Sequence, residues 1–249
     1  MERRGWKRRV ARRGGLIAHV VTFTNLGCGF AAILLAFEGR PGQAVSLIFL
    51  AGVLDFFDGA LARLAGHGSP LGRELDSLAD LVSFGVVPAL LAYQNQWGPS
   101  RVVVGVVCLA FVVGGAWRLA LFNVLEPVRD FRGLPITVAG MILTALAYLA
   151  YLGEPWPWPV LAVCTLVLLL LMVSPVRFVK LSRVITPLLR RLPEAARWAT
   201  LLLALPTLAI ILVPLPQAVV GLGAIYILLS LVEDRRSPSA VRFQEEARG

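Results

Sequence analysis

The sequence predicts an all-α fold, a polytopic transmembrane bundle of about eight helices. Of its 249 residues, 57% are hydrophobic and only 16% are charged, whereas soluble domains contain about 25% charged residues. Apolar runs of about 17–25 residues, the length that crosses a bilayer, recur along the whole chain. The net charge of +9 comes from basic residues at the ends of these runs. That pattern is typical of membrane topology and gives no reason to expect nucleic-acid binding.

The individual helices are predicted from eight apolar segments. These segments cover residues 16–37, 43–64, 73–95, 102–124, 135–153, 157–174, 199–214 and 216–232. Pro206 is expected to kink the seventh segment. Pro214 and Pro216 separate the seventh segment from the eighth, so the last two are interpreted either as two short spans or as one re-entrant hairpin.

The distribution of lysine and arginine predicts the orientation. With the N-terminus in the cytosol, every lysine and arginine except Arg40 and Arg101 falls on the cytosolic side, as the positive-inside rule requires. We therefore expect an integral protein of the cytoplasmic membrane, with both termini facing the cytosol. The expected organisation is a basic cytosolic N-terminus (1–15), a membrane-embedded core (16–180), and C-terminal membrane segments with a cytosolic tail (181–249).

Four of the six aspartates fall in one short stretch, DFFDGALARLAGHGSPLGRELDSLAD, inside or beside predicted membrane helices: Asp55, Asp58, Asp76 and Asp80. A carboxylate at membrane depth costs a few kcal/mol, and four would repel one another, so a cation is expected among them. The first pair is spaced by three residues and the second by four, so each pair shares one helical face. The two helices are expected to be antiparallel, joined by the loop 65–71, which brings the pairs together near the cytosolic ends of the helices. Such a set suits Mg²⁺ or Mn²⁺, with room for two ions, an arrangement that serves phosphoryl-type displacement.

The residues around the aspartates fit a phosphate ligand. Gly59, Ala62 and Gly72 are small enough to let a bulky ligand approach the backbone. Arg63 offers a bidentate fork for phosphate, and Ser69 offers a hydroxyl from the loop. The non-enzyme alternative is an ion or proton transporter that uses intramembrane aspartates. That alternative explains the carboxylates but not the small residues and the arginine at fixed offsets.

The same stretch resembles a known family signature. Asp-x-x-Asp-Gly-x-x-Ala-Arg begins at Asp55 and is followed, after eight residues, by Gly-x-x-x-Asp-x-x-x-Asp beginning at Gly72. This pattern resembles the signature of the CDP-alcohol phosphotransferases. Further stretches are similar to the phosphatidylserine synthase branch of that family: TFTNLGCGFAA (22–32), ELDSLADLVSFGVVPA (74–89), WRLALFNV (117–124), FRGLPIT (131–137) and LMVSPVRFVK (171–180).

The resemblance implies an activity and its partners. It implies that the core 16–180 is a catalytic core of six helices, embedded in membrane lipid and followed by a C-terminal hairpin. The active site is expected to face the cytosol. The reaction would transfer the phosphatidyl group of CDP-diacylglycerol to the hydroxyl of L-serine, giving phosphatidylserine and CMP. Glycerol 3-phosphate or inositol phosphate is the alternative acceptor, because the same aspartate motif serves all of these reactions. Family members are often homodimers, so a homodimer is expected by analogy.

The resemblance also implies a role for each site residue. Asp55, Asp58 and Asp76 would hold the metals, while Asp80 would complete the metal site and act as general base. The CDP-lipid pocket would be formed by Asn25, Gly59, Ala62, Arg63, Ser69 and Gly72. Arg118 and Asn123 are expected to bind the acceptor or a lipid phosphate. The simpler interpretation of these two is a snorkelling arginine and a helix-end asparagine.

Overall fold

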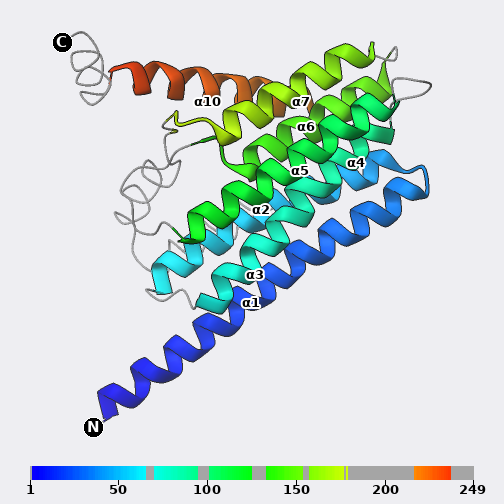
Figure 1. Ribbon diagram of the computed structural model, residues 1–249. Coiled ribbons are helices and arrows are strands. Elements are labelled where there is room, and N and C mark those ends of the chain that lie inside the picture. The colour runs from blue at the N-terminus through cyan, green and yellow to red at the C-terminus, as the bar shows by residue number, and fades with distance from the viewer. Residues whose placement is uncertain are drawn as a thin grey trace, which may run out of the picture.

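A computed structural model describes most of the chain as a bundle of long helices packed side by side (Figure 1). The described backbone comprises residues 2–65, 70–94, 101–124, 133–153, 157–176, 178 and 216–236. Side chains are described for residues 19–55, 70–94, 101–124, 133–153, 157, 159–176, 178 and 216–232. Within these ranges all regular structure is helical, which confirms the predicted fold class.

The helices follow the predicted segments closely. They are α1 (Glu2–Phe37), α2 (Pro41–Ala65), α3 (Pro70–Asp80), η1 (Leu81–Val86), α4 (Val87–Gln94), α5 (Arg101–Val124), α6 (Ile136–Leu152), α7 (Trp158–Val173) and α10 (Pro216–Arg236). One difference is that α1 begins at Glu2, so the basic N-terminal segment continues the first membrane helix and extends past the other helices in Figure 1. The predicted segment 199–214 lies outside the described residues.

Several helices are apolar enough to lie in a membrane. Three stretches are also long enough to cross one: His19–Phe37, Pro70–Gln94 and Arg101–Val124. Shorter apolar helices are Pro41–Asp55, Ile136–Leu152, Pro159–Val173 and Pro216–Val232. Large apolar side chains are exposed on the outer faces, as in Phe30, Leu109 and Leu170, where lipid tails would surround them. The chain is thus a polytopic helical membrane protein.

The segment from α3 to α4 is one continuous rod with an irregular middle. Residues Leu81–Val86 form a π-helical stretch immediately after Asp80. Such stretches add a residue to a helical turn and are frequent at functional sites. The π-helical stretch is buried at Ser83, Phe84 and Gly85, where it packs against α1, α5 and α6. It therefore lies at the centre of the bundle, directly after Asp80 in the chain.

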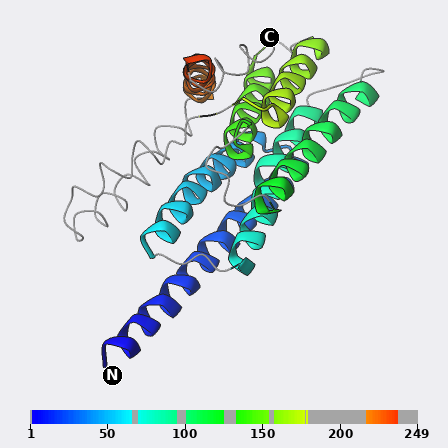
Figure 2. The ribbon, with the colours of Figure 1, turned by 60° about the vertical axis from the view of Figure 1, so that its left-hand side comes forward.

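The C-terminal helix α10 is inclined to the rest of the bundle. Figure 1 shows it lengthwise, and Figure 2 shows it nearly end-on, while the other helices are seen along their length in both views. It packs against α6, where Gly223 lies against Ile142. Tyr226 on the same helix lies beside Phe178, with ring centroids 6.0 Å apart. The inclined helix thus covers α6 and the segment that follows α7.

Close approach of α6 to the π-helical stretch depends on Gly140. A Cβ at this position would collide with the backbone of Phe84. Lipid tails are as apolar as leucine, so the hydrophobic effect does not drive helices together in a membrane. They associate through tight packing of this kind instead. Gly140 therefore sets the distance between α6 and η1.

We expect Gly140→Ala to destabilise the protein by about 1–3 kcal/mol, because the added methyl group forces two backbones apart. Gly27→Ala on α1 is the matched control, since nothing lies within 4 Å of a Cβ there. Both changes gain helix propensity of up to about 1 kcal/mol, so only the collision separates them. Thermal unfolding in detergent measures the difference. Equal unfolding temperatures for the two variants would contradict this account of the packing.

Candidate metal and catalytic site

Three of the predicted aspartates converge from two antiparallel helices. Ligand oxygens of Asp55 on α2 and of Asp76 and Asp80 on α3 all lie within 4.8 Å of one another. Asp80 is only 8% exposed, and the other two are half-buried. The side chain of Asp58, the fourth predicted ligand, lies outside the described residues. The short spacing within each pair and the antiparallel pairing thus bring the described carboxylates to one place.

The carboxylates lie inside their helices, more than one turn from the helix ends. Asp80 ends the first 11 residues of the continuous helical rod Pro70–Gln94. It therefore lies about 15 Å from the start of that rod, and Asp76 lies about one turn closer to the start. Asp55 is similarly placed in the 25-residue helix α2. The predicted position of the site, near the cytosolic ends of the two helices, stays a prediction.

Asp80 is held by a neutral side chain from the first helix. Asn25 Nδ2 donates a hydrogen bond to Asp80 Oδ1 at 3.3 Å, and Asn25 is 1% exposed. The hydroxyl of Ser83 in η1 donates to the main-chain oxygen of Asn25 at 3.1 Å. Asn25 Oδ1 is buried and has no hydrogen-bond partner among the described residues. Asn25 thus contacts Asp80 directly and retains an acceptor oxygen facing the interior.

Asp55 also receives a hydrogen bond from a distant helix. Thr137 Oγ1, at the start of α6, donates to Asp55 Oδ2 at 3.0 Å. Sequence reasoning missed this residue, although it falls in the stretch FRGLPIT that supported the family resemblance. Asn25 and Thr137 therefore give each of two carboxylates a neutral donor from another helix.

Arg118 and Asn123 on α5 lie on the same side of the bundle as α3. Arg118 is 9% exposed and interacts electrostatically with Asp80 and with Tyr226 of α10. Its burial argues against the simpler interpretation of an arginine that snorkels to the membrane surface. Asn123 Nδ2 lies 3.2 Å from Glu74 Oε2 and 3.1 Å from Ser77 Oγ. Asn123 therefore ties the end of α5 to α3, and Arg118 brings positive charge toward the carboxylates.

The predicted CDP-lipid pocket is described only in part. Gly72 is half-buried on α3, beside the aspartates in sequence. Gly59 and Ala62 lie on the helical backbone of α2, but this part of α2 lies outside the described side chains, as does the side chain of Arg63. Ser69 lies wholly outside the described residues. The pocket assignment for these residues therefore stays a prediction.

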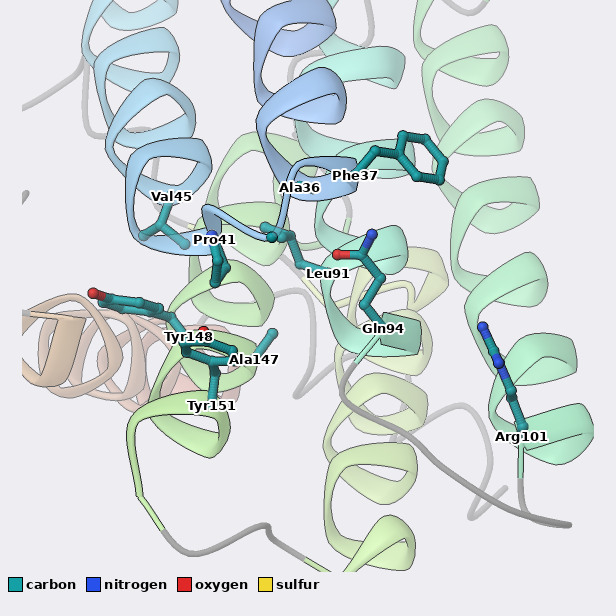
Figure 3. Close-up of a pocket in the computed structure, with 11 residues that line it drawn as sticks. Ala36, Phe37, Pro41, Val45, Leu91, Gln94, Arg101, Ala147, Tyr148 and Tyr151 are labelled. Carbon is teal, nitrogen blue, oxygen red and sulfur yellow. The ribbon is translucent and has the colours of Figure 1, made fainter.

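A separate pocket of about 360 Å³ lies at the other end of the bundle (Figure 3). It is lined by the turn between α1 and α2, the end of α4, the start of α5 and the end of α6, including Pro41, Leu91, Gln94 and Tyr148. Pro41 begins α2, so it lies about 20 Å along that helix from Asp55. None of the predicted site residues lines this pocket, so it is distinct from the carboxylate cluster.

The donor set fits hard divalent cations. Carboxylate oxygens are the ligands that Mg²⁺ and Mn²⁺ prefer, and three of them meet here with one buried. Close like charges in an apolar bundle repel strongly unless a cation lies between them. The neutral donors on Asp55 and Asp80 resemble the outer-shell partners that orient metal ligands.

The fold and the site together define the class: an integral membrane protein whose helices carry a carboxylate site suited to phosphoryl-type transfer. The family model for CDP-alcohol phosphatidyltransferases matches residues 15–170. The chain belongs to that family, as the aspartate pattern predicted. Membership favours the enzyme over the transporter interpretation of the aspartates.

Named relatives make the comparison more specific. The CDP-diacylglycerol–serine O-phosphatidyltransferase of Bacillus subtilis is 38% identical over 161 residues, covering 64% of this chain and 87% of that protein. The protein of the same name from Methanocaldococcus jannaschii is 36% identical over 166 residues, covering 66% and 74%. The archaetidylserine synthase of Methanothermobacter thermautotrophicus is 34% identical over 142 residues, covering 54% and 59%.

We expect Asn25→Ala to lower kcat by about ten- to a hundredfold, since a hydrogen bond to a charged group contributes about 1.5–3 kcal/mol. Thr24→Ala is the control, because among the described residues the Thr24 hydroxyl bonds only the backbone of its own helix at Val20. Steady-state kinetics with CDP-diacylglycerol separate two roles. A fall in kcat supports the contact with Asp80, whereas a rise in KM alone would mean that Asn25 acts in the CDP-lipid pocket instead.

Proposed function

We propose that this protein transfers the phosphatidyl group of CDP-diacylglycerol to the hydroxyl of L-serine, giving phosphatidylserine and CMP. The observation that carries the proposal is the convergence of Asp55, Asp76 and Asp80 within the family's signature. Relatives whose names specify serine as acceptor support the choice of acceptor. Ether-linked lipid is a neighbouring chemistry, as the name of the archaetidylserine relative suggests.

Asp55, Asp58, Asp76 and Asp80 would hold Mg²⁺ or Mn²⁺, and we propose two ions. When bound, the cations would neutralise the phosphate oxygens and the charge that passes to the leaving group. Asp80 is the proposed general base, since it is the most buried of the described carboxylates. Arg63, Gly59, Ala62, Ser69, Gly72 and Asn25 are the proposed contacts to the CDP-lipid.

The chemical step needs one proton transfer and one substitution at phosphorus. Asp80 accepts the proton of the serine hydroxyl while the serine oxygen attacks the phosphorus bonded to the diacylglycerol oxygen. A new bond forms between the serine oxygen and that phosphorus, and the bond from the phosphorus to the oxygen of CMP breaks. Arg118, which interacts with Asp80, is the proposed contact for the serine carboxylate or a lipid phosphate, together with Asn123.

An acceptor screen tests the function. Purified protein with CDP-diacylglycerol should release CMP with L-serine and not with glycerol 3-phosphate, inositol or inositol phosphate. Release should stop with a chelator and resume with Mn²⁺ or Mg²⁺. CMP release with another acceptor and not with serine would keep the reaction class and overturn the acceptor. Ion flux in liposomes without any CMP release would favour the transporter.

Two substitutions separate chemistry from binding. Asp80→Asn should lower the rate by about 10²–10⁴-fold, the usual contribution of a general base, while CDP-diacylglycerol still binds. Arg63→Ala should mainly raise the KM for the lipid. Loss of a phosphate contact that is equally strong in the ground state and the transition state raises KM and leaves kcat unchanged. Near-normal turnover of Asp80→Asn at saturating serine would move the role of base to another carboxylate, Asp76 first.

The proposed orientation places both termini in the cytosol and the protein in the cytoplasmic membrane, on the strength of the lysine and arginine distribution. Cysteines introduced singly as Gly5→Cys and Trp156→Cys, with the 3 native cysteines replaced by alanine, should react from opposite sides. The first should be labelled only from the cytosol and the second only from outside. The reverse labelling pattern would invert the topology.

A further inference from the structure

Thr137 occupies a fixed position at the start of α6. The preceding segment is held to α7 and the residues after it, because Gly133 N–H donates to Val176 O at 2.8 Å and Leu134 N–H to Leu171 O at 3.0 Å. Gly133 has a φ of 82° and leaves no space for a Cβ beside Met172. The backbone that carries Thr137 is therefore anchored before the helix begins.

The hydroxyl of Thr137 reaches a carboxylate of the site. It donates to Asp55 Oδ2 at 3.0 Å across 82 residues of sequence. A carboxylate has about four acceptor positions on its two oxygens, so this bond uses one of them and restricts rotation of Asp55. The first turn of α6 also brings the positive end of the helix dipole toward Asp55.

Ligands of protein metal sites are commonly oriented by such outer partners, whose loss weakens metal binding. We propose that Thr137 is a positioning residue that holds Asp55 in the orientation needed to bind Mg²⁺ or Mn²⁺. This inference rests on the proposed metal-dependent function. It adds a residue that neither the aspartate signature nor the predicted lipid pocket contains.

Thr144 offers a matched control on the same helix. It lies seven residues beyond Thr137, on the same helical face and about two turns further along α6. It is fully buried, and its hydroxyl has no hydrogen-bond partner among the described residues. Thr→Val at either position replaces the hydroxyl with a methyl group, but among the described residues only the hydroxyl at 137 contacts a carboxylate of the site.

The test is a Mn²⁺ titration of substrate-free, detergent-purified protein, with free Mn²⁺ read by electron paramagnetic resonance. Thr137→Val should raise the Kd for Mn²⁺ by about 10- to 100-fold. Thr137→Ser, which keeps the donor, and Thr144→Val should bind Mn²⁺ like the wild type. If the valine variant does not fold, Thr137→Ala takes its place against the same serine rescue. The rise in unfolding temperature that Mn²⁺ causes gives a second measure of the same Kd.

An unchanged Kd in Thr137→Val, an equal loss in Thr144→Val, or no rescue by serine would each overturn the inference. Absence of Mn²⁺ binding to the wild type would overturn it too. The proposed function fails separately. If CMP release requires a different acceptor while the Mn²⁺ results are as expected, the acceptor is wrong and the role of Thr137 stands. If serine transfer is confirmed and the Kd is unchanged, only the role of Thr137 is wrong.

Discussion

The mutual repulsion of carboxylates in an apolar bundle is the constraint on which this structure depends. Asp55, Asp76 and Asp80 present oxygens within 4.8 Å of one another, where neither water nor lipid tails can screen their charge fully. Two surrounding helices give these carboxylates hydrogen bonds from neutral donors, Asn25 of α1 and Thr137 of α6. Neutral donors orient the oxygens without neutralising them, and the one positive charge of Arg118 beside three carboxylates leaves the cluster with negative charge for a cation. A lysine in either place would satisfy the carboxylate and weaken its attraction for the metal.

Small residues make these contacts between helices geometrically possible. Gly29 on α1 lies against Ser83, and Gly140 on α6 lies against the backbone of Phe84. Both contacts are to the π-helical stretch that follows Asp80, so α1 and α6 pack against the same central element. Thr137 lies one turn from Gly140, so the close packing at Gly140 brings the Thr137 hydroxyl within hydrogen-bond distance of Asp55. In lipid, helices associate through close packing of complementary surfaces and not through hydrophobic burial. The packing of the helices therefore also determines where the charged groups lie.

The sequence allowed the helices and the carboxylates to be predicted but not the contacts between distant helices. Apolar run length places a segment in the membrane, and spacings of three and four place aspartates on one face. Neither signal gives the rotation and depth of one helix relative to another. The bonds from Asn25 to Asp80 and from Thr137 to Asp55 span 55 and 82 residues and depend on both quantities. The π-helical stretch was missed for a related reason: Leu81–Val86 is apolar throughout apart from one serine, and its irregularity arises from packing.

The helix α3 shows how one element can serve a lipid and a water-soluble substrate together. Its first turns expose Arg73 and Glu74, which favour water. Asp76 and Asp80 face the interior, while Leu71 and Leu78 are 65% and 59% exposed on the outer surface. A helix is about 10 Å across, so lipid tails against the leucines lie within one helix width of the carboxylates. The exposed polar residues of the first turns would meet water on the same helix. A phosphate held at the proposed site would thus keep its acyl chains in the bilayer while the acceptor hydroxyl came from water, which is the geometry that phosphatidyl transfer needs.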